Sequence, residues 1–278
     1  EEIASEYGTP VYVYNEKILR DRMSKVAKVI TKYPYTANYS VKANTNIHIL
    51  KLALEEGLNC DAMSVGEITL LMKAGFPVER IFFVPNNVAP CELAFALENG
   101  VMTSLDSLSQ LELFGEVCNQ MEIAPENRKC AVRINPGVGA GHHEKVVTGG
   151  KKTKFGIAEY SIPQIFEIAE KYQITIAGIN QHIGSLFMDP QPYLDAVTNL
   201  LRIAHQFKNL EFIDFGGGYG IPYHKLDDEK DFPMEDFKSR LEPILDEFVA
   251  SYGKAPLFKS EPGRYCVAEG SVILGRVH

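Results

Sequence analysis

The sequence LEFIDFGGGYG, at residues 210–220, joins a short apolar run to a cluster of glycines. The bulky apolar residues in its first half predict a buried β-strand that ends at Phe215. The glycines that follow leave the backbone free of Cβ atoms, which favours close approach to an anionic ligand such as a phosphate. A flexible turn is the alternative explanation for the same glycines, so the rest of the chain must decide between the two.

Seven further runs of this kind recur along the chain, and segments with helical periodicity separate them. The eight predicted strands lie at residues 35–41, 58–63, 80–84, 101–104, 129–135, 174–180, 210–215 and 256–261. Long amphipathic helices are expected at residues 15–32, 162–172, 191–207 and 234–252. Other helix ends are marked by two serines with capping-box spacing, Ser64 and Ser107, and by three glycines, Gly57, Gly75 and Gly100.

Strands that alternate with helices in this way argue for parallel βαβ units. Eight such strands predict an α/β fold of the (β/α)8 TIM-barrel type, with a doubly wound open sheet as the structural alternative. No internal repeat, low-complexity tract or linker divides the chain. We therefore expect one barrel domain at residues 15–265, with peripheral segments at residues 1–14 and 266–278.

The composition is that of a soluble globular protein, with 45% hydrophobic and 23% charged residues in a chain of 278. The formal charge of −8 argues against a nucleic acid or an anionic membrane as partner, because those surfaces attract clustered Lys and Arg. Five widely spaced cysteines without a C-x-x-C pair indicate reduced thiols rather than disulfides or a zinc site. We expect a cytoplasmic protein with a small-molecule ligand.

Chemically reactive side chains gather at the predicted strand ends, which meet at one mouth of a parallel barrel. In chain order they are Lys42 and Asn44, Asp61, Arg133 and Asn135, His182 and Ser185, Gly216 to Gly220, and Glu261, Gly263 and Arg264. The set combines an amine, two carboxylates, two guanidinium groups, an imidazole and a glycine loop. Such a combination is typical of a cofactor site.

Pyridoxal phosphate suits this set of side chains. Its phosphate needs backbone N–H groups, which the glycine loop and the Gly263-Arg264 pair offer. Its aldehyde needs an amine, and Lys42 is placed at the end of the first strand. Its ring needs a partner at the pyridine nitrogen, and Glu261 is the carboxylate best placed for that contact.

Four ordered motifs carry a resemblance to a known family. They are YSVKAN at residues 39–44, NQHIGS at 180–185, DFGGGYGIPY at 214–223 and EPGRY at 261–265. Further matching segments begin at Asp61, Pro85, Arg133 and Thr148, so the resemblance covers nearly the whole chain. Together they resemble the signatures of fold-type III pyridoxal-phosphate decarboxylases, and most closely those enzymes that act on diaminopimelate.

The resemblance implies a role for each residue at the barrel mouth. Lys42 would bind the cofactor aldehyde covalently, His182 would stack on the ring, and Glu261 would contact the pyridine nitrogen; these three would be the catalytic residues. The remaining cofactor-binding residues would be Asp61 near Lys42, Arg133, Ser185, and, around the phosphate, Gly217, Gly218, Gly263 and Arg264. Arg264 would in addition bind a substrate carboxylate.

The implied reaction is the decarboxylation of meso-2,6-diaminopimelate to L-lysine and carbon dioxide, the last step of lysine biosynthesis. Decarboxylases of ornithine, arginine, lysine or carboxynorspermidine, and a non-catalytic barrel that binds pyridoxal phosphate, are the alternatives. A racemase is disfavoured, because it places Arg rather than a carboxylate such as Glu261 against the pyridine nitrogen. The resemblance also implies a homodimer and a C-terminal β-domain that is missing from this chain, to which the peripheral segments would belong.

Two other features have competing explanations. The cluster of His142, His143 and Glu144 suggests a metal site, but adjacent histidines point in different directions, and we expect no metal. The cluster lies in the long glycine-rich connection at residues 135–154, which is typical of a functional or mobile loop. Asp61 has a structural alternative, since its carboxylate would also suit a cap for the helix that follows.

Overall fold

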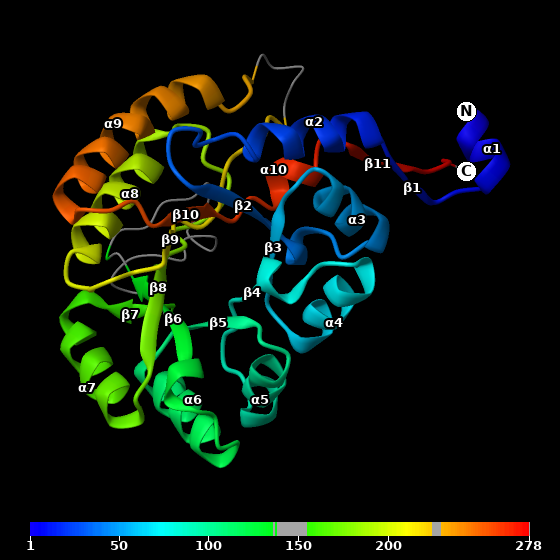
Figure 1. The fold of residues 1–278 in the computed structure, drawn as a ribbon. Helices are drawn as coiled ribbons and strands as arrows, with labels where there is room; N and C mark the ends of the chain where they lie inside the picture. The colour runs from blue at the N-terminus through cyan, green and yellow to red at the C-terminus, as the bar shows by residue number, and fades with distance from the viewer. Residues whose placement is uncertain (136, 138–154, 224–228, 278) are drawn as a thin grey trace.

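The computed structural model describes residues 1–135, 137, 155–223 and 229–277. Eight parallel strands form a closed barrel (Figure 1). They are β2 (Tyr35–Ser40), β3 (Asn59–Ala62), β4 (Ile81–Phe83), β5 (Met102–Leu105), β6 (Lys129–Asn135), β8 (Thr175–Asn180), β9 (Phe212–Asp214) and β10 (Leu257–Ser260). Neighbouring strands pair in the order β5-β4-β3-β2-β10-β9-β8-β6, and β5 pairs with β6 to close the ring. The predicted barrel is confirmed, and the open sheet is excluded.

Helices surround the barrel on its outer side (Figure 1). They are α2 (Glu16–Val26), α3 (Ile47–Glu55), α4 (Val65–Ala74), α5 (Pro90–Glu98), α6 (Leu108–Gln120), α7 (Ile162–Tyr172), α8 (Gln191–Ala204) and α9 (Met234–Tyr252). The predicted caps are confirmed, because Ser64 and Ser107 accept backbone N–H groups at the starts of α4 and α6. The three predicted end glycines all have positive φ and follow α3, α4 and α5.

The structure differs from the sequence prediction at several element ends. The helix expected at residues 15–32 ends at Val26, because the chain must turn to enter β2. Helix α8 ends at Ala204 rather than at residue 207. The sequence analysis does not predict three short elements, α1 (Glu2–Tyr7), β7 (Ile157–Ala158) and α10 (Arg264–Val267).

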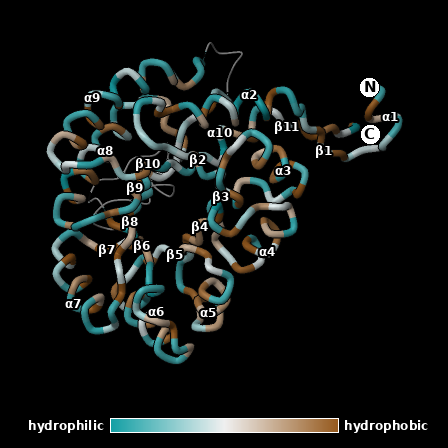
Figure 2. The backbone as a smooth tube through the Cα atoms, viewed as in Figure 1, coloured by the Kyte–Doolittle hydropathy of each residue, from teal (hydrophilic) through white to brown (hydrophobic). Residues whose placement is uncertain are grey.

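Alternation along the barrel strands separates two apolar clusters. Ile81 and Phe83 of β4 belong to the large cluster between strands and helices, whereas Phe82 belongs to a smaller cluster inside the barrel. The same holds in β6, where Val132 packs toward the helices and Ala131 packs inward. In Figure 2 the outer turns of α6 and α7 are largely hydrophilic, as expected for helices that bury one side against the strands.

A two-stranded antiparallel ribbon lies to one side of the barrel. It pairs β1 (Val11–Tyr14) with β11 (Ser271–Leu274), and both chain ends lie next to it (Figure 1). Tyr12, Val272 and Ile273 of the ribbon are exposed. That the ribbon belongs to a further β-domain stays a prediction. In the part of the chain that the structure describes, no helix has the length and apolar character needed to cross a membrane.

Candidate functional site

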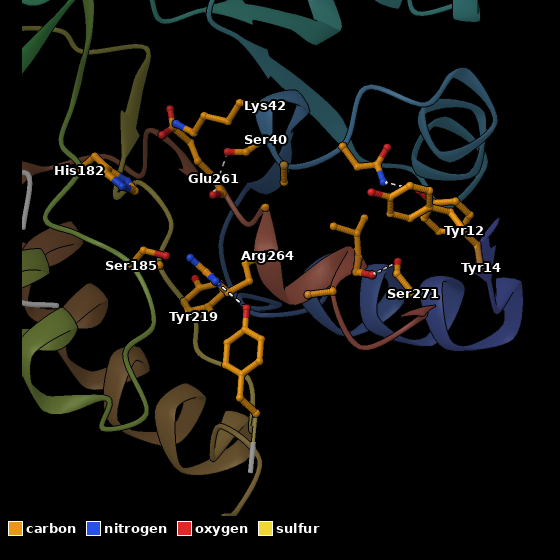
Figure 3. Close-up of a pocket in the computed structure, with 17 residues that line it drawn as sticks. Tyr12, Tyr14, Ser40, Lys42, His182, Ser185, Tyr219, Glu261, Arg264 and Ser271 are labelled. Atoms are coloured by element: carbon orange, nitrogen blue, oxygen red, sulfur yellow. Dashed lines mark hydrogen bonds between the residues drawn. The ribbon is translucent and has the colours of Figure 1, made fainter. Parts of the chain in front are cut away.

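A cavity of about 490 Å³ opens at the carboxyl ends of the barrel strands (Figure 3). Its lining includes seven of the residues that the sequence assigns to the site: Lys42, His182, Ser185, Gly218, Glu261, Gly263 and Arg264. The other three, Asp61, Arg133 and Gly217, are buried and do not contribute to the lining. The fold therefore brings most of the expected residues together around one space.

Lys42 reaches the cavity from a short 3-10 turn, Val41–Ala43, that follows β2 directly. The side chain is exposed, and its Nζ lies 3.9 Å from the Met63 Sδ at the end of the neighbouring strand β3. Ser40 donates a hydrogen bond from Oγ to the backbone carbonyl of Glu261 at 3.2 Å. This bond ties the first barrel strand to the last one beside the amine.

Glu261 follows β10 and is almost fully buried. Burial raises the pKa of its carboxyl, the charge of Asp214 raises it further, and Lys42 and Arg133 oppose the shift. Its Oε1 has no hydrogen-bond partner among the described residues. A buried carboxyl with an unused acceptor is suited to a ligand nitrogen that carries a proton.

Asp61 lies in β3, the strand that pairs with β2. Burial raises the pKa of its carboxyl to about 8, and the charge of Glu261 adds to the effect while that of Lys42 opposes it. Ser64 caps α4, so Asp61 does not serve as the cap of that helix. The carboxyl is thus a buried group that titrates near neutral pH, close in space to the amine and to Glu261.

The glycine loop that follows β9 is held by backbone hydrogen bonds. Gly216 donates its N–H to Oδ1 of Asp214 at 2.9 Å, and its carbonyl accepts the N–H of Glu261 at 2.9 Å. A Cβ at Gly217 would clash with the backbone carbonyl of Glu261, and Gly218 has a φ of 123°. Glycine is therefore required at these positions, and Gly218 is the member of the loop that lines the cavity.

His182 and Ser185 come from the segment after β8. The His182 Nδ1 accepts the N–H of Gly217 at 3.4 Å. Partial burial lowers the pKa of the imidazole well below its usual value, and the positive charges of Lys42 and Arg133 lower it further. The ring is therefore neutral near pH 7, and a neutral flat ring stacks readily on another ring.

The two guanidinium groups of the predicted site differ in their surroundings. Arg264, at the start of α10, lines the cavity and donates from Nη1 to the Tyr223 hydroxyl, while its Nε has no hydrogen-bond partner among the described residues. Arg133 is buried in β6, 5.0 Å from the centre of the Phe155 ring, and burial lowers its pKa. Arg264 therefore offers a donor to an anionic ligand, whereas Arg133 acts on the site through its charge.

Residues of the ribbon also line the cavity, which the sequence analysis misses. Tyr12 and Tyr14 of β1 and Ser271 of β11 lie on the side opposite His182 (Figure 3). Asn44 donates a hydrogen bond from Nδ2 to the Tyr14 hydroxyl at 3.2 Å. Asn44 is among the strand-end residues that the sequence places at the barrel mouth, but its contact with Tyr14 is not visible in the sequence. The pairing of residues 11–14 with residues 271–274 joins the two ends of the chain, and no local pattern predicts it.

The predicted absence of a metal is not tested throughout the chain. Among the described residues, no group of three His, Cys, Asp or Glu side chains is arranged to hold a metal ion. His142, His143 and Glu144 lie outside the described residues, as does most of the long connection at residues 135–154.

The residues at the cavity fit the cofactor that the sequence predicts. Glu261 offers a buried acceptor to a pyridine N–H, and the glycine loop offers backbone groups that no Cβ covers. Arg264 has an unused donor for a phosphate, and Lys42 supplies an exposed amine for an aldehyde. Pyridoxal phosphate carries all of these complementary groups.

Comparison with known proteins points to the same chemistry. The family described as "Pyridoxal-dependent decarboxylase, pyridoxal binding domain" matches residues 16–268. The diaminopimelate decarboxylase of Methanothermobacter thermautotrophicus is 40% identical, over 100% of this chain and 65% of its own length. That of Staphylococcus aureus is 32% identical, over 99% of this chain and 65% of its own length. The chain thus spans just under two thirds of these curated relatives.

Among solved structures, the diaminopimelate decarboxylase from Helicobacter pylori complexed with L-lysine has a TM-score of 0.89 to this chain at 27% sequence identity. The match covers 98% of this chain and 68% of that one. The fold described here therefore has a close counterpart among solved structures.

Proposed function

This chain belongs to the family of pyridoxal-dependent decarboxylases. On this premise we propose that it binds pyridoxal 5′-phosphate at the barrel mouth and acts as an amino-acid carboxy-lyase on meso-2,6-diaminopimelate. The products would be L-lysine and carbon dioxide. The observation that carries the proposal is the convergence of Lys42, Gly218 and Glu261 on one cavity.

We assign each residue at the cavity a separate task. When bound, the cofactor supplies an aldehyde that bonds to amines and a ring that withdraws electrons from the substrate α-carbon. Lys42 is the amine that holds the aldehyde, and Glu261 holds a proton on the pyridine nitrogen. His182 packs against one face of the ring and keeps water from that side. Backbone N–H groups of the glycine loop, with Gly263, Arg264 and Ser185, bind the phosphate.

The surrounding charges support the task given to Glu261. Its pKa is raised by burial, so the carboxyl needs a cationic partner to ionise. A protonated ring nitrogen is such a partner, and the resulting charge-assisted hydrogen bond is stronger than a neutral one. Asp61, whose pKa is raised to about 8 by burial, adds a second buried carboxyl whose charge interacts with those of Lys42 and Glu261.

The substrate is the part of the proposal that rests most on the relatives. The 40% identity to a diaminopimelate decarboxylase favours diaminopimelate over the shorter or longer basic amino acids. Arg264 has a donor without a partner and is suited to a substrate carboxylate as well as to the phosphate.

The test is an assay of the purified protein with pyridoxal phosphate and meso-2,6-diaminopimelate. We expect equal amounts of carbon dioxide and L-lysine. Carbon dioxide from ornithine, arginine, lysine or carboxynorspermidine instead would change the substrate. Cofactor binding without carbon dioxide from any of them would favour the non-catalytic barrel, and inversion of stereochemistry alone would favour a racemase.

Two finer expectations, a cytoplasmic location and a homodimer, remain part of this proposal. All five cysteines are free, and all but Cys91 are buried, which favours a reducing compartment. The homodimer rests on the family resemblance, and sedimentation of the purified protein tests it.

A further inference from the structure

The barrel interior holds a buried lysine that the mechanism above does not use. Lys259 lies in β10, two residues before Glu261, and is 9% exposed. Its ammonium lies 3.8 Å from the centre of the Phe212 ring and 4.9 Å from that of Phe82, and both rings belong to the inner apolar cluster. The side chain therefore enters the barrel rather than the solvent.

A buried aspartate lies beside this lysine. Asp214 of β9 is the register partner of Lys259 in the parallel pairing of β9 with β10. Burial lowers the pKa of Lys259, and the charges of Asp214 and Glu261 oppose this shift. Burial raises the pKa of Asp214, while the Gly216 N–H and the charge of Lys259 oppose the rise and the charge of Asp61 in β3 adds to it.

Asp214 connects the lysine to the glycine loop. Its Oδ1 accepts the N–H of Gly216 at 2.9 Å, and its Oδ2 accepts the Nδ2 of Asn38 in β2 at 3.3 Å. The other positive charges near Glu261 are those of Lys42, which follows β2, and of Arg133 in β6. Because an ionised carboxylate accepts stronger hydrogen bonds than a neutral one, the hold on Gly216 depends on the charge of Asp214.

We propose that Lys259 is a positioning residue for the phosphate-binding loop: its buried ammonium balances the charge of Asp214, and Asp214 in turn holds residues 216–218 in the shape that receives the cofactor. The inference rests on the proposed function, since it concerns the same site. Lys259 is not part of the cavity lining, so it acts on the cofactor through other residues, and the proposed route runs through Asp214.

A buried ammonium is a poor device for stability alone. Moving a charge from water into a protein interior is unfavourable, and a well-packed apolar side chain of similar volume often serves the fold equally well. When Lys259 is replaced, Asp214 can take up a proton near neutral pH, which limits the damage to the fold. The variant should therefore remain folded but lose the negative charge that holds Gly216.

The test uses Lys259→Met, which keeps the apolar stem between the two phenylalanine rings and removes the charge. The affinity for pyridoxal phosphate is measured by absorbance titration at pH 7 and at pH 9. We expect about tenfold weaker binding than in the wild type at pH 7, the order expected when a charge-assisted hydrogen bond is replaced by a neutral one. The loss should shrink at pH 9, where Asp214 ionises without the lysine, whereas a purely structural lesion would weaken binding equally at both pH values.

Two further variants test whether Lys259 acts through Asp214 or only through a change in the net charge of the protein. Lys129→Met removes an exposed lysine that pairs with Glu211 on the barrel surface, and it should leave the affinity unchanged. Asp214→Asn keeps an acceptor for Gly216 without the charge, and it should weaken binding about as much as Lys259→Met does. The double variant should be no weaker than either single one, and losses that multiply to about a hundredfold would overturn the route through Asp214. If Lys259→Met does not fold, the cofactor affinity of the double variant, which carries neither charge, is compared with that of Asp214→Asn alone. The double variant should again bind no more weakly than the single one.

A measurement without cofactor distinguishes this inference from the proposed function. In cofactor-free protein at pH 7, residues 214–220 should take up deuterium faster in Lys259→Met than in the wild type or in Lys129→Met. Failure of the wild type to bind pyridoxal phosphate would overturn the proposed function. Unchanged deuterium uptake in Lys259→Met would overturn the inference, whatever its affinity for the cofactor.

Discussion

The two faces of the barrel wall differ in chemistry although both are buried. On the outer face, Phe83 and the helix residues Leu50 and Phe114 that pack against the wall are apolar and at most 1% exposed. On the inner face, at the carboxyl ends of the strands, Asp61 and Glu261 are almost as deeply buried but titratable. Burial of the first set stabilises the fold, whereas burial of the second opposes it. Folding and ligand binding are therefore carried by opposite sides of the same strands.

Lys42→Ala is expected to show the largest difference between an effect on catalysis and an effect on stability. The side chain is exposed, so the unfolding temperature should not change, while the decarboxylation rate should fall by about a thousandfold or more because the reacting amine is lost. Carbon dioxide release and thermal unfolding measure the two effects. Lys51→Ala, an exposed lysine of α3, is the matched control, and full activity in Lys42→Ala would remove that residue from the mechanism.

The opposite result is expected for Phe114→Ala on the outer face. Loss of this buried ring should lower the free energy of unfolding by about 3–5 kcal/mol. The rate per folded molecule should stay unchanged, because the barrel wall separates the ring from the cavity, whose lining does not include it. Urea unfolding measures the loss, and Phe166→Ala, on the 40% exposed ring of α7, should cost no more than about 1 kcal/mol. Equal losses in the two variants would contradict the account of the outer face.

Glu261→Gln is expected to slow the reaction without weakening the fold. The amide can bind a ring nitrogen but cannot stabilise its positive charge, which should cost roughly 2–4 kcal/mol in the transition state, or about 30- to 1,000-fold in kcat. Stability should be equal or higher, since a buried titratable group is removed. The rate is compared at full cofactor occupancy, checked by absorbance. An unchanged kcat there would reopen the racemase and the non-catalytic barrel.

The stability of the cofactor-free protein should fall as the pH rises from 5 to 9. Asp61 keeps its proton up to about pH 8 in the folded state, whereas in the unfolded chain it loses the proton near its ordinary value of 3.8. Its contribution is therefore complete below pH 3.8 and is lost as the pH rises toward 8, with a slope of at most about 1.4 kcal/mol per pH unit.

Asp61→Asn is the control for this pH dependence, because the amide does not titrate. Urea unfolding at several pH values should give a flatter profile for the variant than for the wild type. Carboxyls with lowered pKa, such as Glu159 beside Arg202, act only at more acid pH. The pKa of His182 is also lowered, so its contribution opposes the fall below about pH 6.5, and it does so equally in both proteins. Identical slopes in both proteins would show that Asp61 ionises normally.

The sequence predicts the barrel well because its signals are local. Each predicted strand is a short run between helical segments, and the observed strand ends differ from the predicted ones by no more than two residues. The reactive residues follow those ends, so their convergence comes from the topology. Local patterns carry no information on the ribbon that brings Tyr12 and Tyr14 to the cavity, or on the register that places Lys259 opposite Asp214 in the barrel wall. Both depend on which distant segments pack together.

The central claim is that the cavity at the barrel mouth joins pyridoxal phosphate to Lys42. The most direct test is borohydride reduction of the protein in the presence of the cofactor, followed by peptide mapping with mass spectrometry. The account predicts one phosphopyridoxyl group, carried by the peptide that contains Lys42, and none in Lys42→Ala. A label on Lys151, Lys152 or Lys154 instead, or on no lysine at all, would contradict it.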